Sequence, residues 1–154
     1  MATKDKPFPE GFHSITPYLV VKGAAAAIDF YKAAFGATEL MRMPQAEGRV
    51  GHAELKIGDS VIMLADEFPE MKIVGPKTLG GTTVGILLHV RDAEATFNRA
   101  VSLGAQVLRP MADQFYGDRS GTLIDPFGHK WTISHHVEHL SPEELQRRIA
   151  ASGK

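Results

Sequence analysis

An internal repeat constrains the fold of this chain more than any other feature of its sequence. The segment LVVKGA at Leu19–Ala24 recurs as LHVRDA at Leu88–Ala93, and GATEL at Gly36–Leu40 recurs as GAQVL at Gly104–Leu108. The offset drifts only from 69 residues (19 to 88) to 68 residues (36 to 104). A spacing this constant indicates one supersecondary unit written twice. The chain is therefore expected to fold as two similar modules.

Each copy is predicted to contain a strand, an amphipathic helix ended by a glycine, and three further strands. The first strands are expected at 14–22 and 82–91. The later strands are expected at 37–43, 50–57, 60–65, 105–109, 117–124 and 129–136. The fold class is therefore α+β, with two βαβββ modules that form curved half-barrel sheets and a short C-terminal helix.

The predicted organisation has five parts. They are a flexible N-terminal arm (1–13), a first module (14–65), an inter-module linker (66–81), a second module (82–137) and a C-terminal helical tail (138–154). The linker is long for a compact domain and rich in proline and glycine, so it is either a plain connection or a flap. The tail begins with Ser141, Pro142 and Glu144, which form a capping signature for a surface helix.

Composition narrows the classes of partner. Of 154 residues, 44% are apolar, and 17 basic residues balance 18 acidic ones. This balance argues against nucleic acid or an anionic membrane as the partner and favours a small molecule. The chain has no cysteine, which excludes a disulfide framework and a thiolate metal site. The sequence shows no signal-peptide pattern and no apolar run of membrane-spanning length, so a cytoplasmic protein is expected.

Side chains alternate along a strand, so the apolar parity of each strand is expected to face its helix. Ile15, Leu19 and Val21 are assigned to the helix side of the first strand, and Val84 to that of the second module. The opposite parity would line a ligand groove. Its expected lining residues are Thr16, Tyr18, His52, Glu54, Met63, Gly85, His89, Thr132 and Ser134. Tyr116 is a further candidate, either for a pocket wall or subunit seam or for simple packing.

The segment Asp125–Trp131 (DPFGHKW) is predicted to be a tight turn between the last two strands. Pro126 suits a turn, and Gly128 can adopt a positive φ. Trp131 falls on the apolar parity and is expected in the core or at an interface.

Three motifs carry a resemblance to a known family. Together with the duplicated βαβββ pattern, Ile28–Tyr31 (IDFY), Gly58–Leu64 (GDSVIML) and DPFGHKW make residues 14–137 resemble the vicinal oxygen chelate superfamily. That superfamily includes glyoxalase I, bleomycin-resistance proteins, fosfomycin-resistance enzymes and extradiol dioxygenases. The stretch from Tyr116–Arg119 (YGDR) onward resembles its PhnB-like branch.

The resemblance implies four ligand positions for a divalent metal. Each module supplies two of them, at groove-facing positions on its outer strands. In this chain they hold Thr16, Met63, Gly85 and Thr132. None of these supplies the imidazole or carboxylate that such a metal requires. The expectation is therefore no metal cofactor and no Lewis-acid chemistry of the family type.

Two function classes remain open. The favoured one is a metal-independent small-molecule binding protein resembling the bleomycin-resistance type. The alternative is a glyoxalase-like lyase or isomerase, or a dioxygenase. It would use a displaced Zn, Ni, Mn or Fe site made by His52, Glu54 and His89, or metal-free acid–base catalysis. The cluster His135, His136 and His139 is interpreted as surface histidines, because neighbouring strand residues face opposite ways. The resemblance also implies a homodimer.

Overall fold

The structure is a computed structural model of the chain and describes residues 7–153. Part of the expected N-terminal arm, residues 1–6, lies outside the described residues. Backbone contacts divide the chain into two compact units, Met1–Gly80 and Gly81–Lys154, and each is described by itself. No helix within residues 7–153 is long and apolar enough to cross a lipid bilayer.

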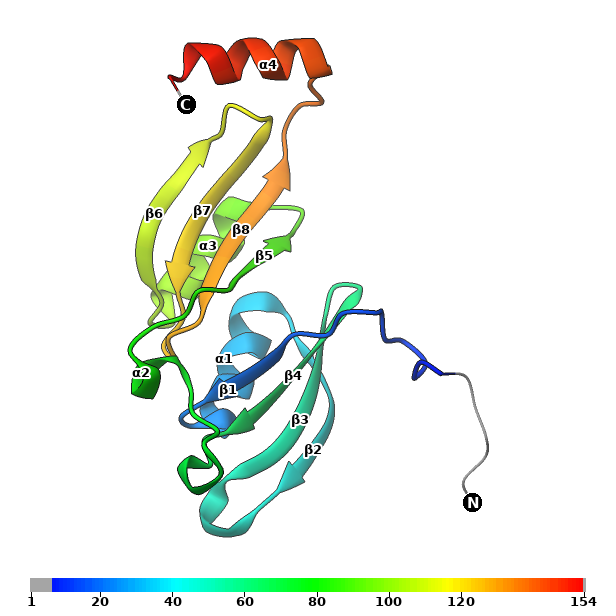
Figure 1. Ribbon diagram of the computed structural model, residues 1–154, viewed down its shortest axis with the longest axis vertical. Coiled ribbons are helices and arrows are strands. Elements are labelled where there is room, and N and C mark those ends of the chain that lie inside the picture. The colour runs from blue at the N-terminus through cyan, green and yellow to red at the C-terminus, as the bar shows by residue number, and fades with distance from the viewer. Residues whose placement is uncertain (1–6, 154) are drawn as a thin grey trace. The chain divides into compact units, whose positions relative to one another are not determined.

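The first unit is a four-stranded sheet with one helix against a face (Figure 1). Its elements are β1 (Tyr18–Val21), α1 (Ala24–Phe35), β2 (Thr38–Pro44), η1 (Ala46–Gly48), β3 (Val50–Ile57), β4 (Ser60–Asp66), η2 (Pro69–Met71) and α2 (Pro76–Leu79). The strand order is β1-β4-β3-β2, in which β1 runs parallel to β4 and the other pairs are antiparallel. Buried Ile28, Tyr31 and Phe35 give α1 its sheet-facing stripe.

The second unit repeats this arrangement. Its elements are β5 (Gly85–His89), α3 (Ala93–Ser102), β6 (Gln106–Asp113), β7 (Asp118–Ile124), β8 (Lys130–His136) and α4 (Pro142–Ala151). The strand order is β5-β8-β7-β6, with β5 parallel to β8. The predicted α+β fold of two βαβββ modules with a short C-terminal helix is confirmed. Ser141 caps α4 as predicted, with its hydroxyl accepting from Glu144 N at 3.1 Å.

The first strand of each unit is shorter than predicted, and the packing of two apolar residues was predicted wrongly. Ile15 and Val84 are 84% and 70% exposed, because they precede β1 and β5 rather than lying in them. Pro17 lacks an N–H, and only its carbonyl joins the sheet, accepting from Met63 N at 2.9 Å. Strand alternation therefore does not extend to these residues.

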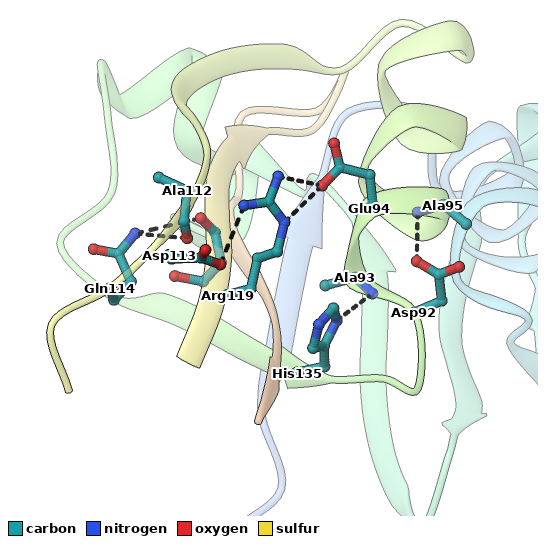
Figure 2. Close-up of polar contacts among 10 residues, drawn as sticks. Asp92, Ala93, Glu94, Ala95, Ala112, Asp113, Gln114, Arg119 and His135 are labelled. Atoms are coloured by element: carbon teal, nitrogen blue, oxygen red, sulfur yellow. Dashed lines mark hydrogen bonds and ion pairs between the residues drawn. The ribbon is translucent and has the colours of Figure 1, made fainter. Parts of the chain in front are cut away.

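The last strand of each unit caps the helix of that unit. The buried Asp66 carboxylate, at the end of β4, accepts hydrogen bonds from Gly23 N and Ala24 N at 2.8 and 2.9 Å. In the second unit, His135 Nδ1 on β8 accepts from Ala93 N at 2.9 Å (Figure 2). Asp66 and His135 are 69 residues apart, which is the repeat offset. Both side chains satisfy amide groups that a helix leaves without a partner.

The DPFGHKW turn is organised by one buried carboxylate. Asp125, which is 3% exposed, accepts from Phe127 N and His129 N at 2.9 and 3.0 Å through Oδ1. Its Oδ2 accepts from Trp131 Nε1 at 2.9 Å. Trp131 is 1% exposed, so it lies in the core of the second unit as predicted. Through these three hydrogen bonds, the aspartate joins the turn to the core of the second unit.

The segment 66–81 is braced by polar contacts between its own residues. Glu67 accepts from Gly75 N at 2.8 Å and from the Thr78 hydroxyl at 2.5 Å. A bridge also joins Phe68 to Ile73. Hydrogen bonds from Thr78 and then Gly75 lower the pKa of Glu67 below its ordinary value. The loop therefore has an anionic anchor at its base.

Candidate functional site

One row of side chains crosses the first sheet on the face that points away from α1, which we call the open face. Tyr18 of β1 lies opposite Met63 of β4, Met63 lies opposite Glu54 of β3, and Glu54 lies opposite Met41 of β2. The alternating residues of β1 and β3, such as Leu19 and Leu55, are buried toward α1. The structure thus brings together the predicted residues Tyr18, Glu54 and Met63.

A hydrogen-bonded relay of three side chains lies on this open face. Tyr18 Oη is 2.8 Å from His52 Nδ1, and His52 Nε2 is 3.2 Å from Glu54 Oε1. The rings of Tyr18 and His52 have centroids 5.4 Å apart. Tyr18 is 51% exposed, whereas His52 and Glu54 are half-buried. Partial burial raises the pKa of Tyr18, so the phenol keeps its proton at neutral pH.

With a neutral imidazole, only one assignment of protons satisfies both contacts of this relay. The Glu54 carboxylate can only accept, so His52 Nε2 carries the ring proton and donates it. His52 Nδ1 then accepts from the Tyr18 hydroxyl. This tautomer is assigned from the hydrogen-bond network. The relay could pass a proton between the phenol and the carboxylate, and it holds all three side chains in place.

Methionines surround the relay. Met43 of β2 lies opposite His52, so it shares the open face with Met41 and Met63. Met41 and Met43 are 36% and 49% exposed. Thioethers are polarizable and adapt to irregular apolar shapes. The open face of the first unit therefore combines an aromatic ring, flexible apolar side chains and one carboxylate.

The corresponding face of the second unit, away from α3, carries hydroxyl groups instead. Thr132 of β8 lies opposite Leu87 of β5 and Thr122 of β7, and the two threonine hydroxyls are 3.0 Å apart. Leu87 takes the register position of Tyr18, and Thr132 that of Met63. Thr122 was not among the predicted residues, although the alternation of β7 could have identified it.

The other predicted residues of this unit are spread along β5, β8 and a turn. Gly85 lies opposite Lys130, whose Cε would be 3.0 Å from a Cβ placed on the glycine. The exposed His89 lies opposite Ser134, which is 1% exposed, with its hydroxyl 3.5 Å from Asp118 Oδ2. Tyr116 lies in the turn between β6 and β7, with 43% of its surface exposed.

Neighbouring residues at the ends of β7 and β8 face opposite ways. Arg119 points toward α3, where it pairs with Glu94 at 2.8 Å and with Asp113 of β6 at 3.2 Å (Figure 2). His135 likewise turns toward α3, whereas His136 is exposed and pairs with Asp118 at 2.8 Å. The predicted opposite facing of His135 and His136 is thus confirmed, but His135 is half-buried and caps α3, so it is not a surface histidine as predicted.

The four positions that the sequence resemblance implies for metal ligands carry neither imidazole nor carboxylate. Thr16 is half-buried ahead of β1, Met63 offers a thioether, Gly85 has no side chain, and the Thr132 hydroxyl is bonded to another threonine. Hard or borderline divalent ions prefer imidazole and carboxylate ligands. Nowhere in residues 7–153 are three His, Cys, Asp or Glu side chains grouped to hold an ion.

The displaced metal set proposed from the sequence is divided between the two units. His52 and Glu54 are bonded to each other on the first sheet. His89 is exposed on β5 of the second unit. Each unit by itself therefore provides at most two members of this set.

Comparison with known proteins adds family information. The model of the family described as Glyoxalase/Bleomycin resistance protein/Dioxygenase superfamily matches residues 11–133. An uncharacterised protein of Mycobacterium bovis is 43% identical over 143 residues, which cover 91% of this chain and 94% of that protein. The crystal structure of TioX from Micromonospora sp. ML1 is 27% identical with a TM-score of 0.63, covering 80% and 98% of the two chains. The PhnB protein from Bacillus cereus shares the fold at 18% identity, with a TM-score of 0.62 and coverage of 80% and 99%.

Proposed function

The chain belongs to the Glyoxalase/Bleomycin resistance protein/Dioxygenase superfamily, and from this membership we propose that it is a metal-independent small-molecule binding protein. Sequestration of the ligand is its activity. The ligand has a planar or partly apolar body that lies against the Tyr18 ring and Met63. Within the superfamily, we assign the chain to the PhnB-like branch.

The observation that carries this proposal is the registered row Tyr18–Met63–Glu54–Met41 on the open face. An exposed aromatic ring beside flexible apolar side chains provides contact area, and a few fixed polar groups provide orientation. The relay of Tyr18, His52 and Glu54 fixes those polar groups before any ligand arrives. Such preorganisation lowers the entropy cost of binding.

Metal independence is supported by the chemistry of four side chains. The resemblance implies ligand positions at Thr16, Met63, Gly85 and Thr132, and these residues offer neither imidazole nor carboxylate. On this proposal, the binding role does not depend on an ion.

Calorimetric titration with bleomycin-like and aromatic compounds tests the binding role. Saturable binding is expected, and Tyr18→Ala should weaken it about two- to tenfold, because an aromatic contact contributes about 0.5–1.5 kcal/mol beyond the area that it buries. Met71→Ala is the control, since that exposed apolar residue lies in η2 rather than in the strands that carry the row. Equal loss of affinity in both variants, or no saturable binding, would contradict the proposal.

The second candidate function is a glyoxalase-like lyase or isomerase. The relay favours it, because a Tyr–His–Glu chain can serve as an acid–base group without a metal. Metal analysis of untagged protein separates the metal-dependent version. Stoichiometric Zn, Ni, Mn or Fe that is lost in a His52→Ala/His89→Ala variant would contradict the metal-independent binding role and support the metal-dependent enzyme.

We also propose that the protein is a homodimer, as its family resemblance implies. Sedimentation velocity at micromolar concentration provides the measurement. A monomer at all accessible concentrations would contradict this proposal without affecting the binding role.

A further inference from the structure

The charge of the ligand can be inferred from the hydrogen-bonding groups that the relay leaves available. Resting on the proposed binding role of the open face, we propose that the site takes an organic cation, a protonated amine or amidine attached to an apolar body. Three properties of the first unit lead to this proposal: the direction of the relay, the isolation of the Glu54 carboxylate, and the apolar groups around it.

Both donor protons of the relay are used within it. The Tyr18 hydroxyl donates to His52 Nδ1, and His52 Nε2 donates to Glu54 Oε1. The groups that remain for a ligand are the lone pairs of Tyr18 Oη and the second carboxylate oxygen, Glu54 Oε2. Both are acceptors only. A ligand that meets this pair must therefore bring donors of its own.

No Lys or Arg side chain pairs with Glu54 within the described part of the first unit. The His52 imidazole is its only polar partner there, and the carboxylate side chain is just 20% exposed. Lys56, two residues further along β3, forms no ion pair with it. A partly desolvated carboxylate gains more from a cationic donor than from a neutral one.

Glu39 on the same sheet shows the contrasting situation. Its carboxylate is paired with Lys32 at 2.8 Å and with Arg42 at 2.9 Å. It lies opposite the buried Leu55, so it is on the α1 side rather than on the open face. Hydrogen bonds from Arg42 and then Lys32 lower the pKa of Glu39. The sheet therefore neutralises one carboxylate internally and leaves the other for a partner.

The surroundings of Glu54 suit the apolar part of such a cation. The Tyr18 ring and the Met41 and Met43 thioethers are all substantially exposed. An aromatic face attracts a cation through its quadrupole. Methionines contact alkyl and aromatic groups of varied shape. Charge recognition by Glu54 and contact by these residues would therefore act on the same molecule.

Three probes with one ring and different charges test the proposal. They are 2-naphthylmethylamine, 2-naphthylmethanol and 2-naphthoate, titrated at neutral pH into the full-length protein and followed by the NMR amide shifts of β1, β3 and β4. The amine should bind about tenfold more tightly than the alcohol, in line with a charge-assisted hydrogen bond. The carboxylate should bind most weakly.

Two isosteric variants identify the residue responsible. Glu54→Gln should abolish the preference for the amine over the alcohol, because the amide carries no charge to favour the protonated amine. Glu39→Gln, the matched control, should keep the preference, because that carboxylate is already paired on the other side of the sheet. Amide spectra of both variants that match those of the wild-type protein show that the variants fold.

Each outcome has a definite meaning. Equal binding of all three probes, or strongest binding of the carboxylate, overturns the cation proposal and leaves the binding role intact. Saturation by none of the probes overturns both proposals together. A preference for the amine that survives Glu54→Gln also overturns the assignment to this site.

Discussion

Replacing Asp125 by asparagine should destabilise the second unit far more than its small change in volume suggests. The Asp125 carboxylate is 3% exposed and accepts two backbone N–H groups and the Trp131 indole N–H. In Asp125→Asn, Oδ1 can still accept from the two backbone groups. The new Nδ2 cannot accept from Trp131 and places a donor against a donor.

The magnitude follows from these contacts. A hydrogen bond to a charged group contributes about 1.5–3 kcal/mol, and a buried donor left without a partner costs about 1–3 kcal/mol. One lost indole bond and two weakened backbone bonds together predict a loss of about 3 kcal/mol in the free energy of unfolding. This is a large fraction of the 5–15 kcal/mol that stabilises a typical domain.

Urea unfolding followed by the fluorescence of Trp131, the only tryptophan, measures this loss in the unit that contains it. Asp113→Asn is the matched control, because its carboxylate side chain is 76% exposed and holds only a surface ion pair, which contributes at most about 1 kcal/mol. A loss below about 1 kcal/mol for Asp125→Asn, or losses of equal size in the two variants, would refute the reasoning.

Two further perturbations test other parts of the structure. Gly121→Ala should destabilise the second unit by about 1–3 kcal/mol in thermal or urea unfolding, because overpacking is costly and its Cβ would lie 2.8 Å from Phe97 Cε2 and 3.0 Å from Met111 N; wild-type stability would contradict the packing described. The lowered pKa of Glu67 means that the unfolded chain binds its proton more tightly, so the stabilisation is complete above the unfolded pKa and disappears as pH falls through the lower folded pKa. Glu67→Gln should therefore flatten the acid limb of stability against pH, and the difference in stability from the wild-type protein should be nearly constant above about pH 6; an unchanged acid limb would show that the Gly75 and Thr78 contacts do not stabilise the loop.

The repeat and the strand alternation made much of the fold predictable. Strand β3 has its predicted bounds, and polar and apolar residues alternate in it from His52 to Ile57. Strand β6 continues to Asp113 rather than ending at residue 109. It contains Pro110, which is tolerated there because β6 is an edge strand and need not donate on its outer side.

The site was predictable only in part, since alternation indicates a face but not which side chains meet on it. Tyr18 and His52 lie on β1 and β3, with β4 between them, so no spacing in the sequence indicates their contact. The caps made by Asp66 and His135 were missed for a similar reason. Each side chain is 42 residues from the helix amide that it satisfies.

Those two caps make each helix dependent on the far end of its own segment. A fragment of the first unit that stops before Asp66 would contain every residue of α1 and still lack the acceptor for its opening amides. Partial copies of a repeated segment would therefore be poor folding units, whereas a copy that includes the final strand carries the side chain that caps its helix. The gene is accordingly expected to have grown by whole-segment duplication, and successful circular permutants should open the chain between the units rather than inside either one.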